Sequence, residues 1–344
     1  MSILVVGGGK MGMSHLALIS QYVGKNQVAL CDSKWITRRV FQYLGYKTFA
    51  SIDAAHEGLE RIDGVLIATP THAHAPLARW AIARKIPFFV EKPLTLDAAQ
   101  SRELVAETNA SGTPAQMGFV LRYVASFSRL QALVAEGKLG SVNGYVAVMR
   151  GNVVNKPLAE DDWRGDFRLG GGCLNEYGPH VIDLCRFIFG PVASIEDATQ
   201  GRSFSTLADD RFSVRWRHET GLEGCVEADW SDANKRKSVI EFQVDFEHAR
   251  VRVDNSAIEV EWHPDAPVPP ETQAELEMPP RPANVGFYLR GEEFSLEIED
   301  FLALCMKRNF HSDPALHSNK APDLTDGREV DALIDVIAGK AGLK

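Results

Sequence analysis

The feature that most constrains the fold is a glycine-rich segment that directly follows the first apolar run of the chain. Residues 3–6 are apolar and of strand length, and the segment GGGKMG occupies residues 7–12. This segment fits the pattern G-x-G-x-x-G, and helical spacing continues over residues 11–22. A strand, a glycine loop and a helix in this order predict the first unit of a doubly wound parallel sheet.

The residues of this loop have separate physical tasks. Gly7 allows a tight turn after the strand, Gly9 lets backbone amides approach a pyrophosphate, and Gly12 permits close packing of helix against strand. Lys10 and Met11 stand where the expected helix begins, and the N-terminal amides and dipole of a helix favour a negatively charged group. The segment therefore predicts a dinucleotide site.

The next apolar run is followed by Asp32, which supplies a carboxylate about 20 residues after Gly12. A carboxylate at this place accepts a hydrogen bond from the ribose 2′-hydroxyl and repels a 2′-phosphate. We therefore expect NAD rather than NADP as the cofactor. Lys34, Arg38 and Arg39 keep NADP open as an alternative, because these cations would accept a 2′-phosphate if Asp32 turned away.

The length of 344 residues predicts two domains. Residues 1–120 are expected to form an α/β Rossmann domain, because apolar runs of strand length alternate with helical stretches. The expected strands are 3–6, 27–31, 64–68, 87–91 and 115–119, and the expected helices are 11–22, 35–44, 73–83 and 96–109. Thr95 is the expected N-cap of the last helix, and Gly112 is its expected end.

Residues 121–344 are expected to form an α+β domain with a large, mostly antiparallel sheet. Between residues 240 and 246 apolar residues alternate with Glu241, Gln243 and Asp245, as in a strand with one covered face. Further strands are expected at 212–216, 251–253 and 258–262. Helices are expected at 127–136, after the glycine-rich segment and ending at 189, at 294–307 and at 326–340. Residues 264–282 are rich in proline and are expected to form an excursion on the surface.

Composition argues against several classes of function. The 37 Lys and Arg against 46 Asp and Glu give a net charge of −9 without a basic run, so nucleic acid is not an expected partner. The apolar runs are too short to span a membrane, and the first strand leaves no room for a signal peptide, so we expect a cytoplasmic protein. The 5 cysteines show no metal-ligand spacing, and no metal is expected.

Three further segments resemble the glucose–fructose oxidoreductase, inositol dehydrogenase and MocA (Gfo/Idh/MocA) family. They are ATPTHAH at 68–74, Glu91-Lys92-Pro93, and GGGCLNEYGPHVID at 170–183. The resemblance implies an NAD(P)-dependent oxidoreductase that transfers a hydride between a nicotinamide cofactor and a hydroxyl carbon of a sugar, polyol or sugar derivative. It also implies a cis peptide bond before Pro93, and it adds four cofactor-binding residues: Thr69, Pro70, His74 and Glu91.

The same segments contain the candidates for catalysis. Lys92 follows a predicted parallel strand, where a cation can hydrogen-bond the reacting oxygen and offset the developing alkoxide charge. Glu176 and His180 are four residues apart in a segment expected to be helical, which would place both on one face. A carboxylate beside an imidazole orients the ring and favours its protonated form, so His180 is the expected acid–base group.

Aromatic and fork-shaped side chains are the substrate-binding candidates, since they suit polyol rings and anionic groups. They are Arg122, Tyr123, Trp163, Arg164, Arg168 and Tyr177, joined by Asp183 one turn after His180. The alternative for Arg164 and Arg168 is a salt bridge to Asp161, Asp162 or Asp166, and for Glu176 an ion pair with Arg122 or Arg186. The sequence departs from the family pattern at Thr71, Val120 and Glu176, where the family often has Asn, Asn and Asp.

Two other functions fit the same residues. One is a non-catalytic regulator that binds dinucleotide and sugar, and the other is a glycosidase of this fold that retains its NAD. The sheet expected in residues 121–344 has more strands than helices to cover it, so its free face is expected to pair with another subunit in a homodimer or homotetramer.

Overall fold

The computed structural model describes residues 2–159, 162–268, 273, 285, 289–311 and 321–344. The chain forms two compact units: Met1–Tyr123 with Ala283–Asp331, and Val124–Pro282 with Ala332–Lys344. The first unit therefore includes a segment from late in the sequence, which the division at residue 120 had assigned to the second domain. Most of the predicted proline-rich excursion at 264–282 lies outside the described residues.

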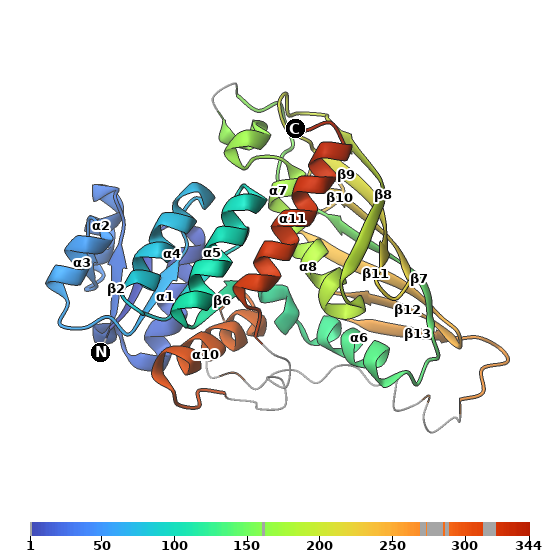
Figure 1. The fold of residues 1–344 in the computed structure, drawn as a ribbon, viewed down its shortest axis with the longest axis horizontal. Helices are drawn as coiled ribbons and strands as arrows, with labels where there is room; N and C mark the ends of the chain where they lie inside the picture. Colours follow the sequence, from blue (N-terminus) through green and yellow to red (C-terminus); the bar gives the residue numbers. More distant parts are fainter. Residues whose placement is uncertain (1, 160–161, 269–272, 274–284, 286–288, 312–320) are drawn as a thin grey trace. The chain divides into compact units, whose positions relative to one another are not determined.

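The first unit contains a six-stranded sheet in the order β3-β2-β1-β4-β5-β6 (Figure 1). Every pairing in it is parallel, which confirms the predicted doubly wound sheet. The order reverses beside β1, and ligands of such sheets bind at the carboxyl ends of the strands at this point. The strands are β1 (Ile3–Val6), β2 (Val28–Cys31), β3 (Lys47–Phe49), β4 (Gly64–Ile67), β5 (Phe88–Glu91) and β6 (Ala115–Gly118).

The helices of this unit agree with the predicted ranges to within a few residues. The structure adds a short helix, α3, that the sequence pattern did not reveal. The helices are α1 (Lys10–Val23), α2 (Trp35–Tyr43), α3 (Ile52–Gly58), α4 (His74–Ala83), α5 (Ala98–Ser111) and α10 (Glu292–Met306). The first unit also contains the start of α11 (Leu324–Lys340), whose residues after Asp331 belong to the second unit.

The ends of α5 test the two predicted caps. Gly112 ends the helix with φ of 65°, as expected. The prediction of Thr95 as N-cap was wrong, because the Asp97 side chain accepts the hydrogen bond from the Ala99 amide. The Thr95 hydroxyl instead lies in a buried hydrogen-bond group with Ser101 and Asp331.

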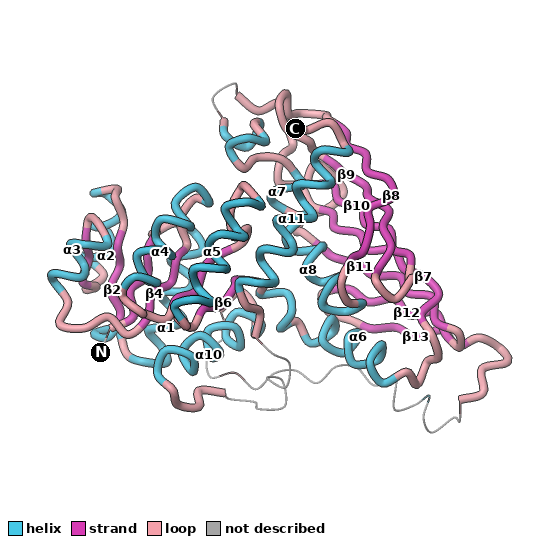
Figure 2. The backbone as a smooth tube through the Cα atoms, viewed as in Figure 1, coloured by secondary structure: helices cyan, strands magenta, loops and turns pink. Residues whose placement is uncertain are grey.

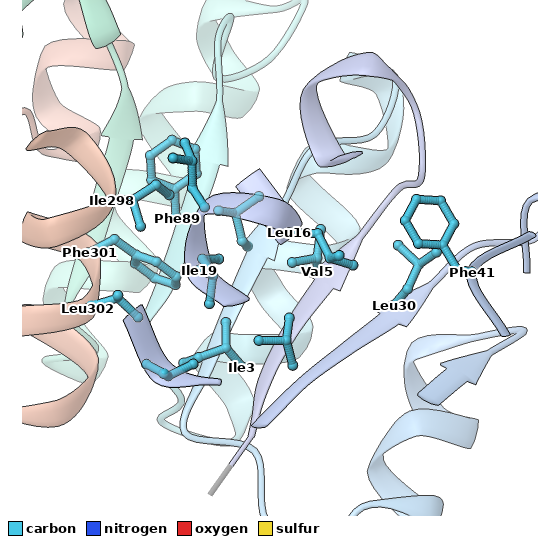
Figure 3. Close-up of a cluster of buried hydrophobic side chains, with 14 residues drawn as sticks. Ile3, Val5, Leu16, Ile19, Leu30, Phe41, Phe89, Ile298, Phe301 and Leu302 are labelled. Carbon is cyan, nitrogen blue, oxygen red and sulfur yellow. The ribbon is translucent and has the colours of Figure 1, made fainter. Parts of the chain in front are cut away.

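The core of the first unit joins β1, α1 and α10 (Figure 3). Ile3 and Val5 of the central strand pack with Leu16 and Ile19 of α1, and Phe301 of α10 completes the cluster. All five side chains are almost fully buried. Burial of such side chains contributes about 1.5–3 kcal/mol each, so α10 is a structural part of this unit.

The second unit contains a seven-stranded sheet in the order β13-β12-β11-β7-β10-β9-β8 (Figure 2). Only the β10–β7 pairing is parallel, which confirms the predicted, mostly antiparallel sheet. The strands are β7 (Val142–Arg150), β8 (Val192–Gly201), β9 (Arg211–His218), β10 (Glu223–Asp229), β11 (Val239–Phe246), β12 (Ala249–Asp254) and β13 (Ile258–Trp262), and the helices α6 (Ala125–Glu136), α7 (Cys173–Glu176) and α8 (Gly178–Phe189).

The two faces of this sheet differ in character. Helices α6 and α8 cover one face, where Phe242 contacts Phe127 edge-on and Tyr145 stacks on Phe189. The alternate side chains of the strands form cross-strand ion pairs on the other face. These pairs are Arg217 with Glu196 and Glu223, Arg250 with Asp245, Arg252 with Glu241, Arg150 with Glu227, and Arg215 with Asp197.

A buried carboxylate, Asp210, anchors the loop between β8 and β9. It accepts hydrogen bonds from the backbone amides of residues 203–205, the Ser205 hydroxyl and the Trp230 indole, at 2.5–2.9 Å. Burial alone would raise the pKa of Asp210, but these hydrogen bonds, led by that from Ser205, hold the pKa below its usual range.

We predict that Asp210→Asn lowers the free energy of unfolding by about 2–4 kcal/mol at neutral pH, since buried donors lose a charged acceptor. Because the folded pKa of Asp210 is lowered, its contribution is fully present above the unfolded pKa and is lost as pH falls through the folded pKa. Urea unfolding across this pH range should therefore show that the difference in free energy of unfolding between Asp210→Asn and wild type becomes smaller in acid. The control Asp245→Asn, which breaks an exposed pair with Arg250, should cost less than about 1 kcal/mol.

Candidate functional site

The glycine loop has the geometry that its spacing predicts. Gly7 has φ of 100°, and a Cβ there would lie 2.3 Å from the Ala68 carbonyl oxygen. A Cβ on Gly12 would lie 1.8 Å from the Gly7 carbonyl oxygen, so α1 meets β1 at backbone contact. Gly9 is different, because a Cβ on it would meet no described atom within 4 Å. Two of the glycines therefore serve the fold, and Gly9 borders open space.

Helix α1 begins beside this open space. Gly9 is its N-cap residue, no side-chain hydrogen bond caps its amides, and its first turn contains no acidic residue. The first amides of a helix lack acceptors within the helix, and with the dipole they favour an anion. These features favour a pyrophosphate beside Gly9, where Lys10 and Met11 supply backbone amides.

Asp32 is fixed next to the glycine loop. One carboxylate oxygen accepts from the Gly8 amide at 2.7 Å and the other from the Lys34 amide at 2.7 Å. Arg38 donates to the backbone carbonyls of Asp32 and Ser33, each at 2.8 Å. The carboxylate thus lies at the carboxyl end of β2, and this Arg38 nitrogen is engaged by the backbone.

The loop after β4 is joined to the loop after β5 by His74. The imidazole is buried, with one nitrogen 3.0 Å from the Thr69 carbonyl oxygen and the other 2.9 Å from the Pro93 carbonyl oxygen. Burial lowers the pKa of His74, and a neutral ring donates to one carbonyl at a time. Thr69, Pro70 and His74 therefore belong to a rigid connection at the same sheet edge.

Strand β5 ends in Glu91, and Lys92 follows it. The Lys92–Pro93 peptide bond is cis, as the family resemblance implied. The Glu91 carboxylate lies 2.7 Å from Nε2 of His15, a buried residue of α1 that the sequence analysis gave no role. Because β1, β2, β4 and β5 are parallel, the glycine loop, Asp32, Thr69 and Lys92 all follow strand ends on one edge of the sheet.

In the second unit the segment with Glu176 and His180 differs from the prediction. The expected single helix is two helices, because α7 ends at Glu176 and α8 begins at Gly178. Pro179 explains the break, since proline lacks an amide hydrogen and is favoured in the first turn of a new helix. Glu176 and His180 are both half-buried. Their proposed relation therefore depends on the turn at Tyr177 rather than on one helical face.

The start of α7 is held by Asp209, a residue that the sequence analysis missed. Its carboxylate accepts from the Leu174 amide at 2.9 Å, and its carbonyl accepts from the Cys173 amide at 2.9 Å. Burial raises the pKa of Asp209 to about 7. The one sequence signal for Asp209 is the adjacent acidic pair at 209–210, directly before the strand predicted at 212–216. Two neighbouring carboxylates are unusual in a protein core.

The structure gives partners within the chain to several substrate-binding candidates. Arg122 forms an ion pair with Asp326 at 3.1 Å, and Tyr123 is buried with its hydroxyl donating to Asp300 at 2.6 Å. Tyr177 is buried with its hydroxyl 2.6 Å from the Ser238 hydroxyl, and Asp183 is also buried.

The remaining candidates lie on short helical turns before the glycine-rich segment. Arg168 pairs with Asp166 at 2.8 Å and Arg164 approaches Asp162 at 3.6 Å, as the salt-bridge alternative predicts. Trp163 is 46% exposed, and the Arg164 guanidinium lies over its ring, 5.0 Å from the centroid. Asp161 lies outside the described residues.

Together these features define a dinucleotide-binding α/β protein with a second unit built on an open sheet. Residues 1–119 match the family described as "Oxidoreductase family, NAD-binding Rossmann fold", and residues 127–252 match the GFO/IDH/MocA C-terminal domain. The two matches come from one family and cover well over half of the chain. The chain belongs to the Gfo/Idh/MocA family of oxidoreductases.

Similar proteins include several sugar and polyol dehydrogenases. Inositol 2-dehydrogenase of Pseudarthrobacter chlorophenolicus is 31% identical over 191 residues, which cover 55% of this chain and 54% of that protein. D-apiose dehydrogenase of Paraburkholderia graminis is 24% identical over 237 residues, 68% of this chain and 61% of that protein. The chain thus aligns with little more than half the length of these relatives.

Solved structures share the fold over almost the whole chain. A levoglucosan dehydrogenase in complex with NADH superposes with a TM-score of 0.78 at 19% identity, covering 99% of this chain and 97% of that one. The WlbA dehydrogenase from Bordetella pertussis, with NADH and UDP-GlcNAcA, gives a TM-score of 0.78 at 18% identity, covering 99% and 95%. Within the described ranges, no helix has the length and hydropathy needed to cross a membrane.

The contrast between Gly9 and Gly12 gives a prediction for cofactor binding. Gly9→Ala should leave the melting temperature unchanged, because the new Cβ meets no described atom and φ is −73°. It should weaken NAD binding by about tenfold or more, because the methyl group occupies the space proposed for the pyrophosphate. A loss of about 1.4 kcal/mol in binding free energy is enough for a tenfold change.

Gly12→Ala is the matched variant. Its Cβ would clash with the Gly7 carbonyl, so the variant should lose thermal stability as well as NAD affinity. Thermal unfolding and fluorescence titration with NADH measure both effects. Unchanged NADH affinity in Gly9→Ala would contradict the proposed place of the pyrophosphate.

Proposed function

We propose that this protein is an NAD-dependent dehydrogenase that transfers a hydride between the nicotinamide and a hydroxyl carbon of a sugar, polyol or sugar derivative. The observation that carries the proposal is the set of groups at one sheet edge. There the open first turn of α1, the fixed Asp32 carboxylate and the Lys92 side chain follow neighbouring parallel strands. The names of the family relatives, inositol and apiose dehydrogenases, support the substrate class.

The fixed Asp32 supports NAD as the cofactor. Its carboxylate is held by the Gly8 and Lys34 amides, so it remains beside the glycine loop rather than turning away. In this position it would accept from ribose hydroxyls and repel a 2′-phosphate. Gly7, Gly9 and Gly12, with Thr69 and Pro70 after β4, would surround the rest of the dinucleotide.

Each catalytic residue would have one task. Bound NAD supplies the hydride acceptor. His180 would take the hydroxyl proton of the substrate, and Glu176 would orient its imidazole. Lys92 would donate a hydrogen bond to the same oxygen and stabilise the negative charge that develops there. Trp163, half-exposed before the glycine-rich segment, would pack against the sugar ring.

We further propose a cytoplasmic homodimer or homotetramer that assembles through the face of the second sheet that carries the cross-strand ion pairs. Alternating positive and negative side chains along this face, such as Arg217 between Glu196 and Glu223, suit pairing with a second copy about a twofold axis. Sedimentation of the purified protein measures this state.

The decisive experiment measures formation of NADH by the purified protein. The substrates are a panel of polyols and sugars that includes inositol, apiose and levoglucosan, each with NAD and with NADP. We expect turnover with NAD and weaker binding of NADP. Binding of NAD and sugar without turnover would favour a regulator, and cleavage of a glycoside without net NADH would favour a glycosidase that retains its cofactor.

We predict that Lys92→Met lowers kcat by about a hundredfold or more and changes NAD affinity only a few-fold. The reason is that Lys92 acts on the reacting oxygen, and loss of one charge-stabilising donor has this size of effect. Steady-state kinetics and NADH titration separate the two quantities. A kcat equal to that of wild type would show that Lys92 is not catalytic.

The second catalytic prediction concerns Glu176. Glu176→Gln should lower activity and move the acidic limb of the pH–rate profile to lower pH, because the neutral amide stabilises the His180 imidazolium less. Glu176→Asp should keep most of the activity, and His180→Ala should cost about a hundred- to ten-thousandfold. If Glu176→Gln only lowers the melting temperature and leaves the profile unmoved, Glu176 has a structural role.

A further inference from the structure

A buried acid–base pair lies behind Lys92 and has no part in the proposed mechanism. His15 of α1 is fully buried and the side chain of Glu91, at the end of β5, is 12% exposed. Nε2 of His15 lies 2.7 Å from one carboxylate oxygen of Glu91. The other carboxylate oxygen accepts from the Lys92 backbone amide at 3.3 Å. One carboxylate thus contacts both α1 and the residue that carries the catalytic ammonium group.

The charge of this carboxylate depends on its neighbours. Burial by itself would raise the pKa of Glu91, but the hydrogen bond from His15, with smaller contributions from Lys92 and His74, holds the pKa below its usual value. On α10, burial and the nearby Glu91 charge raise the pKa of Glu297 well above its usual range. The hydrogen bond from His15 therefore favours the ionised form of Glu91, whereas burial favours the neutral form of Glu297.

The packing around the pair leaves it little freedom. The edge of the Phe89 ring meets the imidazole of His15 with centroids 5.3 Å apart, and Phe294 of α10 lies at 6.4 Å. On β6, a Cβ added to Gly118 would lie 3.1 Å from a Glu91 carboxylate oxygen. In such an enclosed site the position of the carboxylate is set by its hydrogen bonds.

We propose that His15 and Glu91 form a positioning pair for Lys92, in which His15 holds the Glu91 carboxylate and the carboxylate fixes the Lys92 backbone. This inference rests on the proposed role of Lys92 in hydride transfer. His15 lies one turn after Gly12 on α1, so the pair also links the helix of the glycine loop to the strand end that bears Lys92. Glu91 then acts inside the protein, as a support rather than as a direct ligand of the cofactor.

The test is the pH dependence of kcat in His15→Leu. Without His15, burial dominates and the pKa of Glu91 rises, so Glu91 takes up a proton as pH falls toward neutrality. The proposed role needs the ionised Glu91 carboxylate, so activity is present above the raised pKa of Glu91 and is lost as pH falls below it. We expect the acidic limb of the profile to move to higher pH, with kcat about tenfold lower near neutral pH and NAD affinity within a few-fold of wild type.

Three variants distinguish positioning from general packing. His15→Gln retains an N–H donor and should shift the limb less. Glu91→Gln cannot ionise, and His15→Leu combined with it should be no slower than Glu91→Gln alone. The matched control is Tyr22→Phe, which removes another partly buried hydrogen bond between α1 and a carboxylate, the one to Glu299 at 2.8 Å. Its profile should match that of wild type.

An acidic limb of His15→Leu that coincides with that of wild type, or an equal shift in Tyr22→Phe, would overturn the proposal. Infrared difference spectroscopy tests the pair without turnover, because protonated Glu91 in His15→Leu should add a carboxylic acid carbonyl band that the double variant lacks, over the band that other buried carboxyl groups such as Glu297 give in every variant. Absence of this added band near neutral pH would also overturn it. If wild-type protein oxidises no sugar but this band is present, the proposed function fails and the pair itself remains.

Discussion

The close approach of α1 to β1 is the constraint on which the rest of the first unit depends. A side chain at residue 12 would overlap the carbonyl oxygen of Gly7, so only glycine lets the two backbones touch. This contact sets the axis of α1, brings Leu16 and Ile19 over the sheet, and leaves the first turn open beside Gly9. The core and the anion site are thus two results of one steric requirement.

Buried carboxyl groups provide a second level of organisation, because each joins segments that are distant in sequence. Glu91 meets His15 of α1, Asp331 of α11 accepts from Thr95 and Ser101, and Asp209 holds the start of α7. A buried carboxylate must have partners, so each of these contacts specifies one arrangement of its segments. Such contacts also place Lys92 and Glu176 at the ends of elements whose backbones are fixed.

The sequence was sufficient for those parts of the fold that repeat a pattern. The strands around β1 are short apolar runs next to glycine or acidic residues, and the strand at 239–246 shows strict alternation, so all were predictable. Strand β3 was not, because its residues 47–49 are partly exposed and carry no apolar run. The return of α10 to the first unit was also hidden, since periodicity shows that a helix has an apolar face and does not show which sheet receives it.

The residues of the candidate site also divide into those that the sequence predicted and those that it did not. The roles of Gly7, Gly12 and Asp32 follow from spacing, because one backbone geometry links them. His15 was missed because a single buried histidine has no pattern in the sequence, and the acidic pair at 209–210 does not show which element Asp209 will hold. For Tyr123 the sequence predicted a ligand contact, whereas the structure gives its hydroxyl to Asp300.

The late position of α10 has a consequence for how the protein is made. Phe301 and Leu302 pack on Ile3 and Phe89, so the first unit closes its core with residues that leave the ribosome after nearly all of the second unit. During synthesis α1 covers part of one face of the nascent parallel sheet, the part that α10 covers stays exposed, and contacts of such sequence separation form slowly. All strands of the second sheet are made before α10, although residues 332–344 complete the second unit last. The nucleotide-binding unit, although its strands are made first, therefore has a core that cannot be complete until late in translation.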